Sequence, residues 1–151
     1  MSPGARLDIL DRSVDKAYAW INDVAAELET EDRHEAYRAL RAVLHTLRDR
    51  LPIAESAQLA AQLPLLIRGI FYEGWQPARV PQRYREAREF LDRVAQEGIL
   101  HGDTEASFVV AGVARVLTRH ISAGEVDDIL RTLPEPIRAL LAEGVDGERH
   151  A

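Results

Sequence analysis

The chain contains no cysteine, which excludes a disulfide framework, a thiolate metal site and a thiol nucleophile. No run of apolar residues approaches the ~20 that a helix needs to cross a bilayer. Residues 1–6 contain no apolar segment of the kind that a secretory signal requires, so we expect a cytoplasmic protein.

Lysine is almost absent as well, because Lys16 is the only lysine among 19 basic residues. The preference for arginine, together with abundant alanine and leucine, is typical of a GC-rich bacterial genome, so the arginine count is no evidence for phosphate binding. The net charge of −6 argues against nucleic acid as the main partner, since phosphate binding depends on a basic surface.

Strand alternation is nearly absent too, whereas apolar residues recur at helical spacing along most of the chain. This pattern predicts an all-α protein of about eight helices packed as one compact helical domain, and a hydrophobic content of 46% is enough for its core. Asp11 or Ser13 is expected to cap the first helix, Asp32 the second and Ser122 the seventh.

What the sequence does contain is an internal repeat. When the sequence is shifted by 70 positions, residues 15–74 align with residues 85–144 without a gap, and Leu63-Pro64 recurs as Leu133-Pro134. We predict an internal duplication with two pseudo-equivalent copies, consisting of a first helical repeat over 13–74, a linker over 75–82 and a second helical repeat over 83–144.

Several glycines are predicted to end or to bring together helices. Gly74, Gly98 and Gly144 are each followed by an apolar residue that can pack back on the last turn, so we expect each to end a helix. The helix expected from residue 103 to about 120 is apolar nearly all round and should lie centrally, against the other half or a second chain. Gly112 within it would permit a close helix crossing.

Arginines and a histidine line one face of the second predicted helix, at Arg38, Arg41, His45 and Arg48. They could form an anion or phosphate site in which the imidazole acts as an acid or base. The alternative is an ordinary solvated helix face. We refer to these four residues as the arginine–histidine stripe.

An aromatic cluster precedes the linker, and the second copy lacks it. Phe71, Tyr72 and Trp75 could line a ligand groove or anchor a partner, since tyrosine and tryptophan are favoured at interfaces. The alternative is that Phe71 and Trp75 wedge the two copies together. Arg68 and Arg138 recur at equivalent positions and should share a structural role, for which Glu55 and Glu125 are candidate partners.

One metal-like spacing occurs, at Glu31 and His34. Glu-x-x-His is used by carboxylate-bridged di-metal bundles, which need a second such motif. The counterpart here, His101 to Thr104, lacks it, and a helix start explains the residues equally well. We therefore predict no metal site and no cofactor.

The segments from Ala36 to Pro52 and from Leu59 to Trp75 are distinctive. The chain resembles the bacterial domain of unknown function 2267 over most of its length, most specifically from Gln62 to Trp75. The resemblance implies a helical fold and a bacterial origin, and it supplies no catalytic residues.

No catalytic set stands out in the sequence. We therefore predict a non-enzymatic binding or interaction module, whose partner is a second copy (a homodimer) or another protein. The alternative is a small-molecule-binding protein or enzyme that uses a groove between the two repeats, with Tyr72, Trp75, His45 and the nearby arginines. A weaker third prediction is phosphate or nucleic-acid contact through the arginine–histidine stripe.

Overall fold

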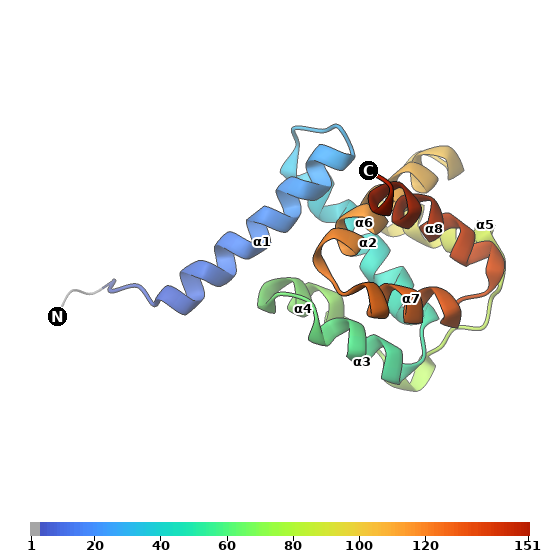
Figure 1. Cartoon of the computed structure of the whole chain (residues 1–151), viewed down its shortest axis with the longest axis horizontal. Coiled ribbons are helices and arrows are strands. Elements are labelled where there is room, and N and C mark those ends of the chain that lie inside the picture. Colours follow the sequence, from blue (N-terminus) through green and yellow to red (C-terminus); the bar gives the residue numbers. More distant parts are fainter. Residues whose placement is uncertain (1–3) are drawn as a thin grey trace.

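The computed structural model describes residues 4–151, which form eight α-helices, one short 3-10 helix and no strand. This confirms the all-α prediction (Figure 1). We call α1–α4 the first half and α5–α8 the second half. The helices of the first half are α1 (Asp8–Glu27), α2 (Arg33–Arg50), α3 (Ile53–Ala61) and α4 (Leu65–Tyr72). After the 3-10 helix η1 (Pro77–Arg79) come α5 (Ala87–Gly98), α6 (Asp103–His120), α7 (Ala123–Thr132) and α8 (Glu135–Arg149).

The helix starts repeat at the spacing of the sequence repeat. The first residues of α2, α3 and α4 lie 70 positions before those of α6, α7 and α8. Descent of the two halves from one duplicated unit stays a prediction.

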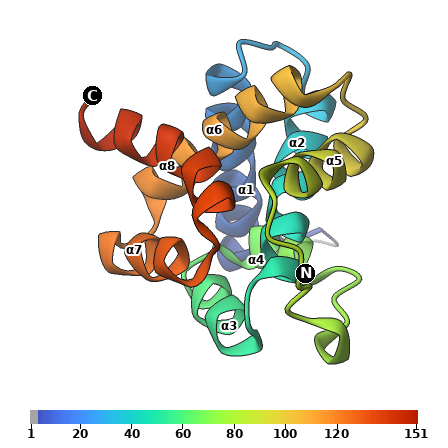
Figure 2. The same ribbon diagram turned by 90° about the vertical axis from the view of Figure 1, so that its right-hand side faces the viewer.

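Packing interlocks the two halves. Helix α2 packs against both α1 and α5, and α6 likewise packs against both α5 and α1. Helix α4 packs on α2 as α8 packs on α6, and α3 meets α7 (Figure 2). Each of these contacts has a counterpart in the other half, as an approximate two-fold arrangement requires. Helix α6 is central, as expected, and buries most of its residues between 106 and 117.

Two predicted caps are present and one is not. The Asp32 carboxylate accepts hydrogen bonds from the backbone N–H groups of His34 and Glu35, and the Ser122 hydroxyl accepts one from Glu125. Helix α1, in contrast, begins at Asp8 rather than after Asp11 or Ser13, and no side chain caps it.

Within residues 4–151, no helix has both the length and the apolar character that a membrane crossing requires.

The predicted glycine stops have different outcomes. Gly74 follows the end of α4 with a φ of +77°, as a helix-ending glycine should. The prediction for Gly144 is wrong, because α8 continues through it to Arg149. A Cβ atom at Gly144 would collide with the carbonyl of Ala111 and lie 2.9 Å from Ala114 Cβ. Gly144 thus lets α8 approach the backbone of α6.

The third stop, at the end of α5, is shifted by one residue. Helix α5 ends at Gly98 as predicted, but the left-handed residue is Ile99, with a φ of +57°. A Cβ atom at Gly98 would lie 3.4 Å from Ala42 Cβ of α2. At the equivalent crossing of α1 with α6, a Cβ atom at Gly112 would lie 2.8 Å from a methyl group of Leu28. Gly112 therefore permits the close crossing that the sequence suggested.

Candidate functional site

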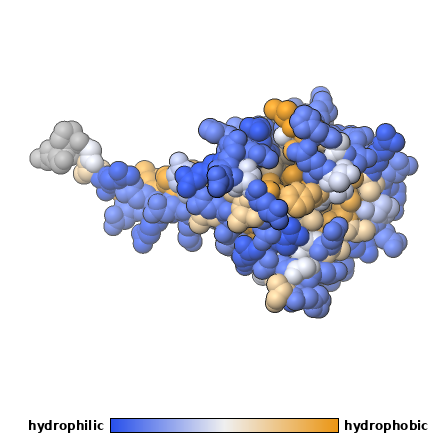
Figure 3. All heavy atoms as spheres, turned by 90° about the horizontal axis from the view of Figure 1, so that it is seen from above, coloured by the Kyte–Doolittle hydropathy of each residue, from blue (hydrophilic) through white to orange (hydrophobic). Residues whose placement is uncertain are grey.

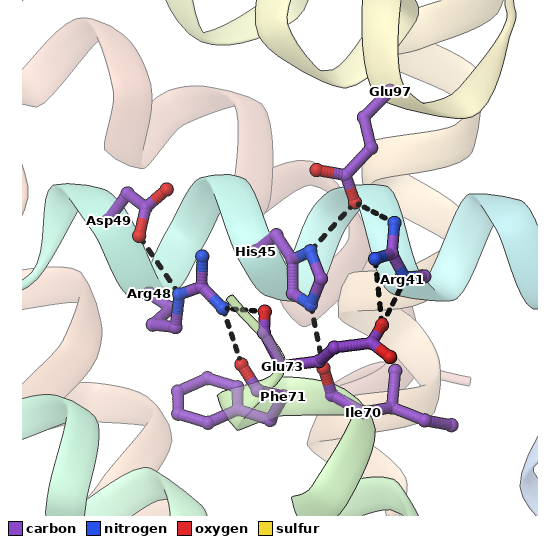
Figure 4. Close-up of polar contacts among 8 residues, drawn as sticks. All are labelled: Arg41, His45, Arg48, Asp49, Ile70, Phe71, Glu73 and Glu97. Carbon is purple, nitrogen blue, oxygen red and sulfur yellow. Dashed lines mark hydrogen bonds and ion pairs between the residues drawn. The ribbon is translucent and has the colours of Figure 1, made fainter. Parts of the chain in front are cut away.

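Two of the four residues of the arginine–histidine stripe, His45 and Arg48, are buried, whereas Arg38 and Arg41 are half-buried. Only 4% of His45 is exposed. Its Nε2 lies 2.6 Å from the carbonyl oxygen of Ile70, and its Nδ1 lies 2.9 Å from a carboxylate oxygen of Glu97 (Figure 4). Both ring nitrogens thus lie within hydrogen-bonding distance of an oxygen atom. His45 thereby joins α2 to the end of α4 and to α5.

Arg48 completes the same junction. Its Nη1 donates hydrogen bonds to the carbonyl oxygens of Phe71 (2.9 Å) and Glu73 (2.8 Å), while its Nε donates to Asp49. The last carbonyl groups of a helix have no partner within the helix. His45 and Arg48 therefore provide polar partners for carbonyl groups at the C-terminal end of α4.

Arg41 lies at the more exposed end of the stripe. It donates from Nε and Nη2 to one oxygen of Glu73, at 2.9 and 2.7 Å, and from Nη1 to Glu97 at 3.3 Å. These hydrogen bonds from Arg41 lower the pKa of the Glu73 carboxyl below its ordinary value. Arg38 is half-buried, and its Nε has no hydrogen-bond partner. Arg41, His45 and Arg48 thus each contact acceptors of the protein itself, and anion binding by the stripe stays a prediction.

The predicted aromatic cluster does form. Phe71 is fully buried, Tyr72 contacts it edge-on at 5.4 Å between ring centroids, and Trp75 lies 5.2 Å from Tyr72. The indole N–H of Trp75 is buried without a partner. These contacts make the cluster continuous with the core at the end of α4.

A polar pocket of about 330 Å³ opens between the two halves. His45 lines it, but Tyr72 and Trp75 do not, so the structure brings together only part of the predicted groove. Occupation of this pocket by a small molecule stays a prediction. Its lining residues come from α2, α5 and the segment before α5: His45, Thr46, Asp49, Gln82, Arg93, Gln96 and Glu97.

The repeated arginines do not contact the partners suggested for them. Arg68 donates to the carbonyl oxygens of Ala60 and Leu63, and Arg138 donates to that of Leu133. The suggestion that Glu55 and Glu125 bind them is therefore wrong. Both arginines instead satisfy backbone carbonyls at the end of the preceding helix.

The predicted Glu31–His34 spacing falls at the start of α2. Both residues are exposed, and Asp32 between them caps the helix. The helix-start explanation accounts for this segment.

Sequence reasoning missed the N-terminal part, at Leu7 and Leu10, of an apolar face that runs along α1. Apolar residues follow one another at alternating spacings of three and four, the spacing of a coiled-coil seam. The exposed fraction falls along this seam from 63% at Leu7 to 54% at Leu10, 42% at Val14, 8% at Ile21 and zero at Val24. The C-terminal half of α1 thus belongs to the core, whereas the same seam continues outward on its N-terminal half. The seam consists of Leu7, Leu10, Val14, Ala17, Ile21, Val24 and Leu28.

The outward half of α1 projects from the body of the protein, as Figure 1 shows. Beside it lies a groove of about 360 Å³ toward α4. Figure 3 shows apolar residues interspersed with hydrophilic ones along the projecting part. We define the α1–α4 apolar face by the exposed large residues of this region, which are Leu7, Leu10, Val14, Tyr18, Tyr37 and Leu66.

Ion pairs fix the other end of α1 to α6. Glu27 accepts hydrogen bonds from Arg115 at 2.7 Å and from Arg119 at 2.6 Å, and Arg119 also binds Glu148 of α8. Burial acts to raise the pKa of Glu27, but the hydrogen bonds and charges of the two arginines outweigh it and lower this pKa. His120 binds Asp23 and stacks on Trp20, so the projecting half extends from a firmly held base.

Comparison with known proteins gives one result. Residues 17–140 match the model of a family described as "Uncharacterized conserved protein (DUF2267)". No curated protein matches the chain.

Proposed function

The chain belongs to the DUF2267 family of uncharacterized conserved proteins, and we propose that it is an interaction module that binds a second copy of itself. The observation that carries this proposal is the α1 seam, which is buried at one end and exposed at the other. A seam of this spacing is the pattern by which helices pair. In a two-fold pairing, the projecting half of α1 in each copy covers the groove beside α4 in the other.

The size of the α1–α4 apolar face supports a second copy as the occupant. The exposed parts of its six side chains amount to on the order of 600 Å², at the upper end of what monomers leave uncovered. A standard interface buries about 800 Å² on each partner. The flanking Leu65, which is 55% exposed at the start of α4, adds to the same face. A symmetric pair applies one such face twice and leaves neither uncovered.

The test is the mass of the protein in solution, measured by sedimentation equilibrium over a range of concentrations. We expect the wild type to approach twice the mass of the chain. Leu10→Asp should raise the dissociation constant on the order of 30-fold, because a charge then enters the centre of the buried patch. Leu10 is 54% exposed, so this change leaves the fold of each copy intact.

Ile99→Asp is the matched control. Ile99 is 69% exposed but lies in the connection between α5 and α6, outside the α1–α4 apolar face. The control adds the same charge and should dimerise as the wild type does. A wild type that stays monomeric at every concentration, or a control that dissociates as readily as Leu10→Asp, would contradict the proposal.

A further inference from the structure

Three carboxylates meet where α3 and α7 cross between the two halves. Glu55 lies in the first turn of α3 and Glu125 in the first turn of α7, at equivalent positions of the repeat. One carboxylate oxygen from each, together with one from Asp128, lies within 4.8 Å of the others. Within residues 4–151 this is the one group of three acidic or histidine side chains close enough to share a cation.

Glu125 distinguishes this group from an ordinary acidic surface. Only 5% of the residue is exposed, and its Oε2 is buried without any hydrogen-bond partner. Oε2 of Glu55 is buried and unpartnered in the same way. Among the described residues, no basic side chain forms an ion pair with either glutamate. Burying a carboxylate without a partner costs free energy. These oxygens would therefore be stabilised by a positive group, and the described side chains supply none.

We propose that Glu55, Glu125 and Asp128 bind one divalent cation of calcium size between α3 and α7. All the ligands are carboxylate oxygens, which hard cations prefer, and the group offers no histidine or thiolate for zinc or copper. Calcium binds oxygen at 2.3–2.6 Å, so ligands on opposite sides of it lie up to about 5 Å apart, as the spread of these atoms allows.

The cation would hold the two halves together at their contact. Helix α3 belongs to the first half and α7 to the second, so each half contributes at least one ligand. Asp128 also pairs with Arg131, whose side chain is 72% exposed. In the absence of a cation, burial, a hydrogen bond with Glu55 and the charges of Glu55 and Asp128 raise the pKa of Glu125 above its ordinary value. A proton shared between the two glutamates is therefore the competing explanation.

The experiment uses the full chain after treatment with a chelator and follows thermal unfolding at pH 7.5 with and without CaCl₂. We expect Ca²⁺ at about 100 times its dissociation constant to raise the unfolding midpoint by roughly 5–10 °C. Isothermal titration with Ca²⁺ should give one site per chain. Mg²⁺ should act more weakly, because it demands shorter and stricter octahedral coordination.

Glu125→Gln should abolish the response to Ca²⁺ while stabilising the metal-free protein, because it keeps the shape of the side chain and removes one of the facing charges. Asp128→Asn, which leaves both glutamates in place, should weaken the response to Ca²⁺ without abolishing it. Glu135→Gln is the matched control, since it makes the same change in the first turn of α8 at an exposed position, and it should respond to Ca²⁺ as the wild type does.

Two outcomes overturn the proposal. One is a wild type whose midpoint does not move with Ca²⁺ and whose Glu125 carboxyl is protonated at neutral pH by carbon-13 NMR, which identifies the shared proton instead. The other is a Ca²⁺ response of equal size in Glu125→Gln, which places the bound ion elsewhere.

Discussion

Gly74 and Gly144 occupy equivalent positions in the two halves, and each directly follows a glutamate, but they have different roles. Gly74 adopts a positive φ in open space and follows the end of α4. Gly144 is helical, and α8 continues past it because the backbone of α6 is too close for a side chain. The same dipeptide thus ends one helix and permits the packing of another. Local sequence sets which conformations are available, and the neighbouring helix decides which one is used.

Helices α1 and α5 give the second contrast. Both end in the same way, since the N–H of Thr30 bonds to the carbonyl of Ala25 as that of Leu100 bonds to Ala95. Each also carries a glutamate near its C-terminal end that binds a helix of the other half. Glu27 of α1 binds Arg115 of α6, and its counterpart Glu97 of α5 binds His45 of α2. Only α1 extends beyond the body of the protein with an apolar seam. The shared features hold the fold together, and the unshared extension is where we place the interface.

The different roles of the two glycines can be tested by replacing each of them with alanine, which adds one methyl group to each half. Gly144→Ala should lower the free energy of unfolding by about 3 kcal/mol, because the new Cβ collides with backbone that cannot move aside. Gly74→Ala should cost only about 1 kcal/mol, the strain of a positive φ. Urea unfolding of both variants measures the difference. Equal losses would show that the close contact of α8 with α6 is not present in solution.

The ion pairs at the ends of α1 and α5 test the second contrast. Glu27→Gln should cost about 2 kcal/mol at neutral pH, since it weakens hydrogen bonds to two arginines. Glu97→Gln should cost less, because Glu97 binds one arginine, at 3.3 Å, besides His45, whereas Glu27 binds two arginines at 2.7 and 2.6 Å.

The effect of Glu27 should also depend on pH in a defined direction. Its pKa in the folded protein is below the ordinary value of 4.5, so its contribution is complete above that value and is lost as the pH falls through the folded pKa. Chemical unfolding at pH 7 and at acidic pH should show the gap between the wild type and Glu27→Gln closing in acid. A gap that is constant with pH would contradict the assigned role of the carboxylate.

Two further substitutions should raise the free energy of unfolding rather than lower it, and by the smallest amounts. Ile99 and Glu29 are equivalent residues with left-handed backbones, at φ of +57° and +56°. Ile99→Gly should raise the free energy of unfolding by about 1 kcal/mol, because a β-branched residue is poorly suited to this conformation. Glu29→Gly should gain only a few tenths, since glycine also adds entropy to the unfolded chain. Thermal unfolding would show the order of the two variants, and a loss of stability in Ile99→Gly would contradict it.

The features that sequence predicted correctly depend on nearby residues. The caps at Asp32 and Ser122 and the stop at Gly74 each require only a few neighbouring positions, and all three are present. The length of α1 was underestimated because no capping side chain marks its start. Gly144 was misassigned because its role depends on Ala111, which lies on another helix.

The candidate sites were harder to predict for the same reason. The stripe residues were identified from α2 alone, but their burial depends on the carbonyl groups of α4 and on Glu97 of α5. The contact of Glu55 with Glu125 depends on the crossing of α3 with α7. A signal for it was available, since identical glutamates at equivalent positions of a repeat can meet on a two-fold axis.

At each of the two close crossings between the halves, a larger residue of the first half faces a glycine of the second half. In one, Leu28 of the first half lies against Gly112 of the second, and in the other, Gly98 of the second half lies near Ala42 of the first. Two first halves placed together would put a Cβ atom of Ala42 against the Leu28 side chain, which would have to shift, while two second halves would set Gly98 against Gly112 with no side chain at either position. At these two crossings the two halves thus complement each other. Covalent linkage of two unlike halves in one chain makes the matching combination available during every folding event.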